Sequence, residues 1–541
     1  MVCSDLELRN KNVNFVENTG FDMEKIPVRY PIGIQSFESL RRLGYLYVDK
    51  TELIHNLVTT SKCVFLSRPR RFGKSLLLST IQAYFEGKRE LFEGLAMERL
   101  ETEWRVHPVL KLSLAKYNSA NEGDLEVILD NQFQIWEQQY DVRIKGGNMS
   151  SRFENIIRSA YDATGKPVVI LVDEYDHPLI ETMHDEERLE AHRLLLKSIY
   201  VNIKDLDEYI RFTMLTGVSR FSKMTIFSGL NNLEDISLNR DYAAICGITD
   251  SELTENFQQG IERFAEEYDT DFDGAVAILK ANYDGYHFAK ESPDIYNPFS
   301  LLRAFKMREI GAYWFQSGTP EFLMRRIRNG GGFLPEMFDE TVEGTTLSAS
   351  DILNDNPTAL LYQTGYLTIK SYEKPDRYRL GIPNLEVRKG LFENLAVRYL
   401  EKDGNYIYNH VREVRKLLEE RRVDEAMERL RTFMAGIPYE FADKATELHY
   451  ENNLFIIFVL VGVDARPEWH TSQGRIDLLL RMRNCIYVIE LKRDGTPEEA
   501  LEQIREKDYT RQFLGDPRPV VELGVTFSTE TRNITAWKVR E

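Results

Sequence analysis

Two groups of residues in this sequence have the types and the spacing of a reactive site. In the first, residues 67–75 read S-R-P-R-R-F-G-K-S and lie between two short apolar runs. A Gly73-Lys74-Ser75 corner between a strand and a helix predicts a phosphate-binding loop, in which backbone amides face the anion and the lysine reaches the outer phosphates. The pattern G-x-x-x-x-G-K-[ST] expects glycine at position 68, where this chain has arginine.

An acidic pair later in the chain fits the same chemistry. Residues 167–172 are apolar without alternation, which predicts a strand buried on both faces of a parallel sheet, and Asp173 and Glu174 follow. Beside Lys74 and Ser75, Asp173 is predicted to help hold a Mg²⁺ ion, and Glu174 is predicted to activate the attacking water as a general base. The alternative is that both acids begin a solvated loop.

A second predicted strand, residues 210–215, ends in further polar residues: Thr216, Ser219 and Arg220. A polar side chain there could sense the γ-phosphate, and an arginine could offset transition-state charge. A surface arginine in a loop explains the pattern equally well. Three more arginines lie in the loop itself: Arg68, Arg70 and Arg71. They could contact phosphates or bind carboxylates of a neighbouring domain.

The second group of residues is near the C-terminus. Residues 474–492 read as two strands joined by a tight turn at 483–484. With this two-residue turn, Asp477 lies directly opposite Glu490, and Lys492 lies on the same face two residues further along. A loop of odd length would break this alignment.

Two carboxylates and an ammonium suit metal-assisted cleavage of a phosphodiester, because the carboxylates hold Mg²⁺ and the lysine helps to position or activate water. The alternative is an exposed face with a cross-strand ion pair. Leu479 and Val488 share the acidic face, which favours a partly apolar cleft. Upstream, Glu447 precedes an apolar run and would be a third metal-binding acid if one helix covers both; an ordinary solvated glutamate fits as well.

Composition limits the class of protein. The 541 residues are 43% hydrophobic and 29% charged, as in soluble globular proteins, and are enough for about three or four domains. No run of 18 apolar residues and no signal peptide is visible, and the four cysteines are scattered, which favours a reducing cytoplasm and no membrane. The net charge of -17 argues against coating nucleic acid through bulk positive charge, although a local basic groove remains compatible.

Strand-like and helical patterns alternate through the first half, which predicts an α/β sheet with right-handed crossovers. From about residue 255 the pattern becomes helical and rich in aromatic residues. A strongly charged helical stretch follows at 411–434, and residues 435–438 break it.

With these residues in place, the chain resembles the bacterial family that joins an AAA-ATPase-like domain to a C-terminal PD-(D/E)XK nuclease domain. The matching segments, which span nearly all of the chain after residue 30, are G-I-Q-S-F-E-S-L-R-R-L-G-Y-L-Y-V-D-K-T, S-R-P-R-R-F-G-K-S-L, L-V-D-E-Y-D, L-T-G-V-S-R-F-S, Y-N-P-F-S-L-L, Y-W-F-Q-S-G-T-P, Y-Q-T-G-Y-L and G-R-I-D-L with I-E-L-K. The resemblance implies that arginine is usual at position 68, and that Glu447 is the acid of the first nuclease helix.

The resemblance also implies the fold class: a P-loop NTPase with an AAA/ASCE-like parallel sheet, a helical lid and a linker region, followed by a restriction-endonuclease-like α/β domain. The predicted divisions are an N-terminal arm at 1–27, the ATPase-like domain at 28–254, the lid at 255–345, a linker or winged-helix region at 346–437, and the nuclease-like domain at 438–541.

The function predicted from these features is an ATP-dependent or ATP-regulated, metal-dependent DNA endonuclease. Its cofactors would be ATP and Mg²⁺, its substrate DNA rather than RNA, and its assembly a candidate homo-oligomer. One alternative is a nucleotide-driven switch whose nuclease fold is inactive, which the acidic net charge favours. Another is an ATPase motor that works as an oligomer with an arginine supplied in trans.

Overall fold

The computed structural model describes the chain from residue 28 onward, with gaps. The described residues are 28–121, 123–143, 146–220, 227, 232–316, 323–324, 327, 334, 338, 340–347, 357–400, 402–436, 447–462, 464–471 and 474–541. The predicted arm at 1–27 lies outside the described residues.

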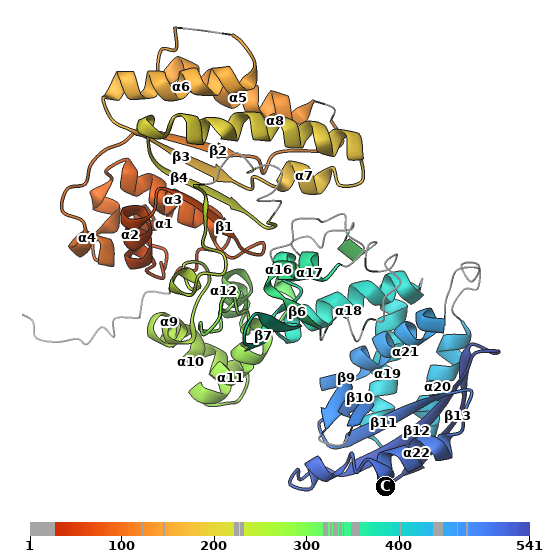
Figure 1. The fold of residues 1–541 in the computed structure, drawn as a ribbon. Helices are drawn as coiled ribbons and strands as arrows, with labels where there is room; N and C mark the ends of the chain where they lie inside the picture. The colour runs from red at the N-terminus through yellow and green to blue at the C-terminus, as the bar shows by residue number, and fades with distance from the viewer. Residues whose placement is uncertain are drawn as a thin grey trace, which may run out of the picture.

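A five-stranded sheet forms the centre of the N-terminal half (Figure 1). Its strands are β1 (Cys63–Ser67), β2 (Val109–Ser113), β3 (Val168–Asp173), β4 (Ile210–Gly217) and β5 (Glu234–Asp235). They are hydrogen-bonded in the order β2-β3-β4-β1-β5, and every pairing is parallel. β1 and β3 are buried at every position, so the predicted strands at 63–66, 167–172 and 210–215 and the predicted P-loop-like sheet are confirmed.

Helices cover both faces of this sheet. They are α1 (Phe37–Arg42), α2 (Thr51–Thr60), α3 (Lys74–Phe85), η1 (Arg89–Phe92), α4 (Ala96–Leu100), α5 (Asp124–Gln139), α6 (Met149–Thr164), α7 (His177–Glu181), α8 (Glu186–Asp205), η2 (Asp207–Tyr209) and η3 (Arg240–Tyr242). In Figure 1, α5, α6 and α8 lie on one side of the sheet, and α1 to α4 lie on the other. The strands are therefore shielded from water on both faces, which explains their continuous apolar sequences.

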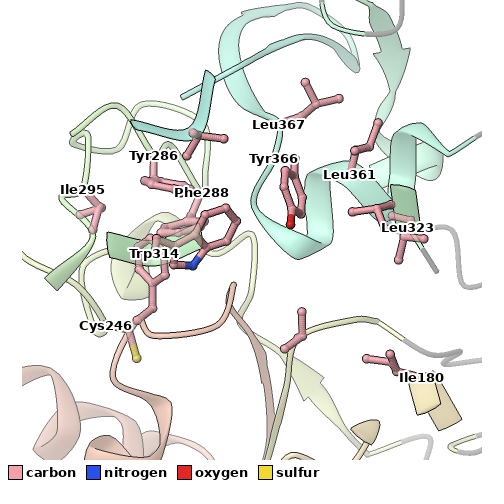
Figure 2. Packing of buried hydrophobic residues seen from close by; sticks show 14 of the residues in the cluster. Ile180, Cys246, Tyr286, Phe288, Ile295, Trp314, Leu323, Leu361, Tyr366 and Leu367 are labelled. Carbon is pink, nitrogen blue, oxygen red and sulfur yellow. The ribbon is translucent and has the colours of Figure 1, made fainter. Parts of the chain in front are cut away.

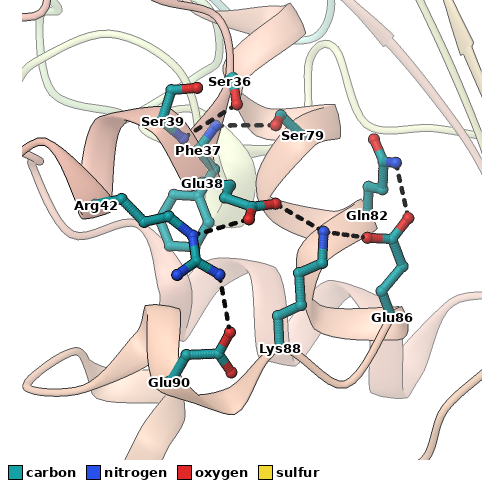
Figure 3. A network of polar contacts seen from close by, with 10 residues as sticks. All are labelled: Ser36, Phe37, Glu38, Ser39, Arg42, Ser79, Gln82, Glu86, Lys88 and Glu90. Carbon is teal, nitrogen blue, oxygen red and sulfur yellow. Dashed lines mark hydrogen bonds and ion pairs between the residues drawn. The ribbon is translucent and has the colours of Figure 1, made fainter.

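A polar network fastens α1 to α3 (Figure 3). The Phe37 N–H donates to Ser79 Oγ at 2.9 Å. Lys88 Nζ lies 2.8 Å from Glu38 Oε2 and 2.8 Å from Glu86 Oε2. Exposed ion pairs of this kind each contribute little, but several together fix the direction of α3. The network thereby ties α1 to the middle of α3 and to the residues that follow it.

The lid region is helical and aromatic, as predicted. It contains α9 (Asp250–Asn256), α10 (Gln258–Glu267), α11 (Phe272–Tyr283), α12 (Pro298–Met307) and α13 (Tyr313–Gln316). The rings of Phe257 and Phe305 stack with centroids 5.3 Å apart, and Tyr30 stacks on Phe305 at 5.7 Å. The segment before α1 is thus packed onto the lid, although the two are far apart in the sequence.

A small antiparallel sheet and three long helices follow the lid. The elements are β6 (Thr341–Glu343), α16 (Gly344–Leu347), α17 (Thr358–Thr364), β7 (Thr368–Glu373), β8 (Arg377–Gly381), α18 (Leu385–Leu400), α19 (Gly404–Glu419) and α20 (Val423–Ala435). The charged stretch at 411–434 is helical as predicted, but it is interrupted at Arg421, whose φ is 60°. The winged-helix assignment and the domain bounds stay predictions.

The C-terminal region has its own five-stranded sheet. Its elements are α21 (Glu447–Val461), β9 (Asp464–Thr471), β10 (Gly474–Arg481), β11 (Ile486–Arg493), α22 (Pro497–Glu506), η4 (Arg511–Phe513), β12 (Val520–Ser528) and β13 (Asn533–Arg540). The order is β13-β12-β11-β10-β9, in which β11 and β12 pair parallel and the other pairs are antiparallel. The helix α22 connects the two parallel strands and begins with the capping box of Thr496 and Glu499.

Within the described residues, no helix combines the length and the apolar character needed to cross a membrane. Cys63, Cys246 and Cys485 are free and buried.

A buried acid in α18 gives a test of how the lid docks. Glu386 Oε1 accepts hydrogen bonds from the Trp314 N–H (2.8 Å) and from Ser300 Oγ (2.9 Å). Burial raises the pKa of Glu386 from 4.5 to about 7. As the pH rises, Glu386 ionises in the unfolded chain near pH 4.5, whereas in the folded protein it stays neutral until about pH 7. The wild type should therefore lose up to about 3 kcal/mol of stability between about pH 4.5 and pH 7.

Glu386→Gln keeps the Oε1 acceptor without the charge, so this loss should be absent from the variant. Urea denaturation at several pH values measures the difference. Glu428→Gln, at an exposed position of α20, is the matched control and should follow the wild type. Identical pH profiles for Glu386→Gln and the wild type would contradict the prediction.

Candidate functional sites

The loop between β1 and α3 has the backbone of an anion site. Gly73 is the residue before α3 and adopts φ 96°, and Arg71 also has positive φ, at 69°. A left-handed position of this kind strains any residue with a Cβ, which explains why glycine stands there. The first amides of α3 have no partner within the helix and are aligned with its dipole, so they can receive a phosphate.

Lys74 and Ser75 are the first two residues of α3, as the sequence predicted. Lys74 is 6% exposed, and its Nζ donates to the carbonyl oxygens of Arg68 (2.8 Å) and Pro69 (3.1 Å). Burial lowers the pKa of Lys74, and attraction from nearby carboxylates opposes this shift, namely those of Asp173, Glu174 and Asp176. The Lys74 ammonium is therefore held at the loop, where the nearby carboxylates favour its charged form.

The predicted acids lie at the same edge of the sheet. Asp173 is the last residue of β3 and is buried, and Thr216 Oγ1 donates to its Oδ1 at 2.9 Å. β4 lies between β1 and β3, so Thr216 bridges the acid-bearing strand and the loop-bearing strand. Glu174 follows with φ 52° and is half-buried. This arrangement brings Lys74, Ser75 and Asp173 together, and their roles stay predictions.

Ser219 and Arg220 are held by protein groups. Asp176 is 1% exposed, and its Oδ2 accepts from both the N–H and the Oγ of Ser219, each at 2.6 Å. Arg220 Nη2 lies 3.0 Å from Asp235 Oδ2 in a buried ion pair. Contact of these two side chains with nucleotide stays a prediction, and the observed contacts favour a role in positioning the end of β4.

Arg68 points away from the phosphate side of the loop. Its Nη1 donates to the carbonyl oxygens of Ser67 and Ser237, both at 2.9 Å, and its Nη2 donates to that of Tyr242 at 3.2 Å. The guanidinium carbon lies 4.2 Å from the centroid of the Phe288 ring. The two predicted partners of Arg68 were phosphate and the carboxylates of a neighbouring domain. The structure shows carbonyl groups and an aromatic ring instead.

This placement predicts a large effect of Arg68 on stability. Arg68→Met leaves buried carbonyl groups without their donor, which should cost about 3 kcal/mol of unfolding free energy. Arg71→Met, on the exposed neighbour in the same loop, should change stability by less than about 0.5 kcal/mol. Urea denaturation compares the two. Equal stability of both variants would show that the buried Arg68 contacts contribute nothing.

Arg70 and Arg71 are placed differently from Arg68. The Arg70 carbonyl accepts a hydrogen bond from Trp314 Nε1 at 3.1 Å, and Arg71 is exposed with its guanidinium 5.1 Å from the Phe299 ring. Neither side chain is fixed by a buried ion pair in the described part of the chain, so both stay predicted phosphate ligands.

The C-terminal hairpin has the predicted register. Leu478 pairs with Ile489 and Arg481 with Ile486, and the Met482 N–H donates to the Cys485 carbonyl at 2.9 Å. The turn therefore consists of two residues, and the prediction that places Asp477 opposite Glu490 is confirmed.

The three predicted side chains of the hairpin gather beneath α22. The Asp477 N–H lies 3.5 Å from Glu490 Oε2, and Asp477 Oδ2 accepts from the Leu491 N–H at 2.8 Å. Lys492 Nζ lies 3.7 Å from Glu490 Oε1. Leu479 and Val488 of the same face pack with Leu501 and Ile504 of α22 and with Tyr509, so the surroundings of the cluster are partly apolar.

Glu490 is the deeply buried acid of this cluster. It is 1% exposed, and burial together with repulsion from Asp477 raises its pKa well above the usual range. Gln503 of α22 donates from Nε2 to Glu490 Oε1 and accepts at Oε1 from Lys492 Nζ. A buried carboxyl beside a second carboxylate gains most from a cation, because a cation offsets both desolvation and repulsion.

Glu447 is the first residue of α21, which also covers 454–461, so one helix does join the acid to the apolar run as predicted. Its side chain lies outside the described residues. Among those residues, no group of three acidic, histidine or cysteine side chains is arranged around one point. Asp477 and Glu490 still fit Mg²⁺, which commonly binds through one or two carboxylates and keeps several waters.

Comparison with known proteins agrees with the predicted family. A family model described as a predicted AAA-ATPase matches residues 31–227, and a model of the PD-(D/E)XK nuclease superfamily matches residues 445–537. A protein of Azotobacter chroococcum mcd 1, described as an uncharacterized protein in the vnfD 5' region, is 35% identical over 521 residues, which cover 94% of this chain and 98% of that protein.

The chain belongs to the family that joins a predicted AAA-ATPase domain to a PD-(D/E)XK nuclease domain. Below, residues 31–227 are called the ATPase domain and residues 445–537 the nuclease domain.

A mostly apolar cavity of about 100 Å³ opens beside Gly73 of the ATPase domain. Its walls come from the segment before α2, from the start of α3 and from the lid, and include Tyr47, Leu76, Ile248, Phe257 and Leu302. Lys50 Nζ donates to both carboxylate oxygens of Glu252 at 2.6 and 2.7 Å. This ion pair joins the segment before α2 to α9 of the lid. The lid is therefore part of the candidate nucleotide site.

Several residues of these sites were not identified by their sequence pattern. Asp176 reads as one more acid of a loop, Trp314 as a core aromatic, and the cavity residues as scattered apolar positions. Gln503 is predicted from the sequence only as a residue of the helix after the hairpin that could approach phosphates. Its bridge between Glu490 and Lys492 depends on how α22 packs on β11, which the sequence pattern alone does not give.

Proposed function

We propose that this protein is an ATP-regulated endonuclease that hydrolyses phosphodiester bonds in DNA with the help of Mg²⁺, and that it acts in the cytoplasm. The cluster of Asp477, Glu490 and Lys492 beneath α22 carries the proposal, because it joins two carboxylates to an ammonium on a rigid hairpin. The ATPase domain in the same chain supports regulation by nucleotide.

In the nuclease domain, Asp477 and Glu490 would hold the metal ion, with Glu447 as a candidate third ligand. A bound divalent ion supplies positive charge to the scissile phosphate and lowers the pKa of a coordinated water. Lys492 would position the attacking water. Gln503 would hold the Lys492 and Glu490 side chains in place relative to each other.

In the ATPase domain, Lys74 and the first amides of α3 would bind the outer phosphates, with Arg70 and Arg71 at the rim. Ser75 and Asp173 would hold Mg²⁺, and Glu174 would act as general base if ATP is hydrolysed. The apolar cavity beside Gly73 has the position and lining expected for a nucleotide base.

Cleavage assays test the proposal directly. Labelled DNA and RNA are incubated with the protein and Mg²⁺ or Mn²⁺, with and without ATP, beside Lys74→Ala and Asp477→Ala variants. We expect metal-dependent cleavage of DNA that changes with ATP, that loses its ATP response in Lys74→Ala and that disappears in Asp477→Ala. Cleavage that persists in Asp477→Ala would exclude this cluster as the active site.

A nucleotide-driven switch with an inactive nuclease fold is the second candidate. The burial of Glu490 favours it, because both Gln503 and Lys492 already contact its Oε1. It predicts ATP binding without cleavage under any metal condition. A pure ATPase motor would in addition show ATP-dependent oligomers in mass measurements.

A further inference from the structure

The phosphate-binding loop is held on its outer side by residues from far later in the chain. Trp314 Nε1 donates to the Arg70 carbonyl at 3.1 Å. Gly365 faces Pro69 so closely that a Cβ at position 365 would lie 2.7 Å from the proline ring. Figure 2 shows Trp314 with Tyr286 and Phe288 beside this loop, and Tyr366 next to them. The loop is therefore in direct contact with this cluster.

Three consecutive carbonyls of the loop share two donors. Lys74 Nζ bonds those of Arg68 and Pro69, and Trp314 Nε1 bonds that of Arg70. When a phosphate binds, Lys74 has a stronger anionic acceptor and exchanges the carbonyls for it. Lys74 thus contacts the loop carbonyls when no phosphate is bound and leaves them when phosphate binds. A ligand that changes contacts in this way can shift the conformational equilibrium of the loop that Trp314 contacts.

Trp314 is also joined to the helix that leads toward the nuclease domain. Its backbone N–H donates to Glu386 Oε1 at 2.8 Å, and Ser300 Oγ of α12 donates to the same oxygen at 2.9 Å. Glu386 stands in the first turn of α18 and is buried. One carboxylate oxygen therefore connects α12 and α13 of the lid to the start of α18.

The other half of α18 packs on the nuclease domain. α18 has 16 residues and so spans about 24 Å. The rings of Phe392 and Phe455 meet edge to face at 5.4 Å, which places α18 against α21. Arg415 of α19 holds the end of α21 through the carbonyl oxygens of Val461 (2.7 Å) and Leu460 (2.6 Å). The helix that carries Glu447 is therefore in direct contact with α18.

We propose that Trp314 and Glu386 form the junction through which nucleotide at the phosphate-binding loop controls the nuclease domain, by setting the position of α18 and α21. The proposal rests on the proposed function and names the regulation of that nuclease site. Trp314 and Glu386 act as positioning residues, since neither belongs to the predicted metal or phosphate ligands.

The test uses the full chain and variants of the junction. Trp314→Phe removes the indole N–H and keeps an aromatic ring, Glu386→Ala removes the shared acceptor, and Glu386→Gln retains it. Trp104→Phe is the matched control, because the buried Trp104 Nε1 has no hydrogen-bond partner among the described residues. ATP binding, DNA cleavage with and without ATP, and ATP-induced changes in amide hydrogen exchange over α18 and α21 are measured.

In the wild type and in Trp104→Phe, ATP should change hydrogen exchange in α18 and α21 and should alter cleavage by roughly fivefold or more, the range of ordinary allosteric coupling. Trp314→Phe and Glu386→Ala should keep the ATP dissociation constant within about threefold and lose both responses. Glu386→Gln should retain them.

An unchanged response in Trp314→Phe would overturn the junction, and so would a wild type in which ATP leaves hydrogen exchange of α18 and α21 unchanged. The exchange readout needs no cleavage. A wild type that never cleaves DNA but shows exchange changes that depend on Trp314 would therefore refute the nuclease function and keep the junction.

Discussion

Asp477→Asn is expected to reduce metal-dependent DNA cleavage on the order of 1000-fold while ATP binding is unchanged. Asparagine has nearly the shape of aspartate, and its oxygen can still accept the Leu491 N–H that Asp477 Oδ2 accepts at 2.8 Å. The variant therefore keeps the hairpin and loses the negative charge that would hold the metal. Initial rates of plasmid cleavage over a range of Mg²⁺ and Mn²⁺ concentrations measure the effect.

Asp508→Asn is the control for this change. Asp508 follows α22 in the same domain and forms an ion pair with Arg511, both at the surface. The control should retain the wild-type rate, because surface substitutions of this kind change stability little. A similar loss in both variants would point to a general effect of the substitution on the domain, and full activity of Asp477→Asn would remove Asp477 from the active site.

Lys74→Met is the second variant with a large expected effect. The ammonium is the cation nearest the predicted β- and γ-phosphate positions, so its removal should weaken ATP binding by about 100-fold, or roughly 2.7 kcal/mol. The variant also leaves the Arg68 and Pro69 carbonyl groups without their donor, so we expect it to lose about 1–3 kcal/mol of unfolding free energy. Titration calorimetry with ATP and Mg²⁺ measures the affinity.

Lys62→Met provides the comparison. Lys62 stands before β1 and pairs with Asp207 at the surface, at the end of the strand away from the loop. It should bind ATP as the wild type does. DNA cleavage by Lys74→Met should continue at the rate seen without nucleotide and should no longer respond to ATP. If Lys74→Met bound ATP with wild-type affinity, the loop between β1 and α3 would not be the nucleotide site.

The two variants separate the two domains. Asp477→Asn should remove cleavage and keep ATP binding, whereas Lys74→Met should remove ATP binding and keep basal cleavage. A protein with an inactive nuclease fold would lose ATP binding in Lys74→Met, and neither the wild type nor the variants would cleave DNA.

Local sequence patterns were sufficient for the elements that carry the chemistry. The apolar runs predicted β1, β3 and β4, because a strand buried on both faces must be apolar at every position. The hairpin register followed from a turn of two residues and the twofold alternation of a strand, so the placement of Asp477 opposite Glu490 required no knowledge of the rest of the fold.

The partners of the arginines and serines were beyond such patterns. Arg68 contacts the carbonyls of Ser237 and Tyr242, about 170 positions later in the chain, and Ser219 is bound by Asp176. These contacts depend on the order of the strands and on the docking of the lid. A local pattern specifies which face of an element is apolar, but it does not specify which distant element will cover that face.

The sequence by itself thus identified the residues of the two candidate sites, since each residue belongs to the local pattern of one strand, one hairpin or one helix start. Only the tertiary structure decided how the sites are surrounded and joined: Lys74 at the loop carbonyls, Gln503 between Glu490 and Lys492, and Trp314 between the loop and α18. The physical reason is that these contacts join residues whose separation in space is set by packing of whole elements, and packing is a property of the complete chain.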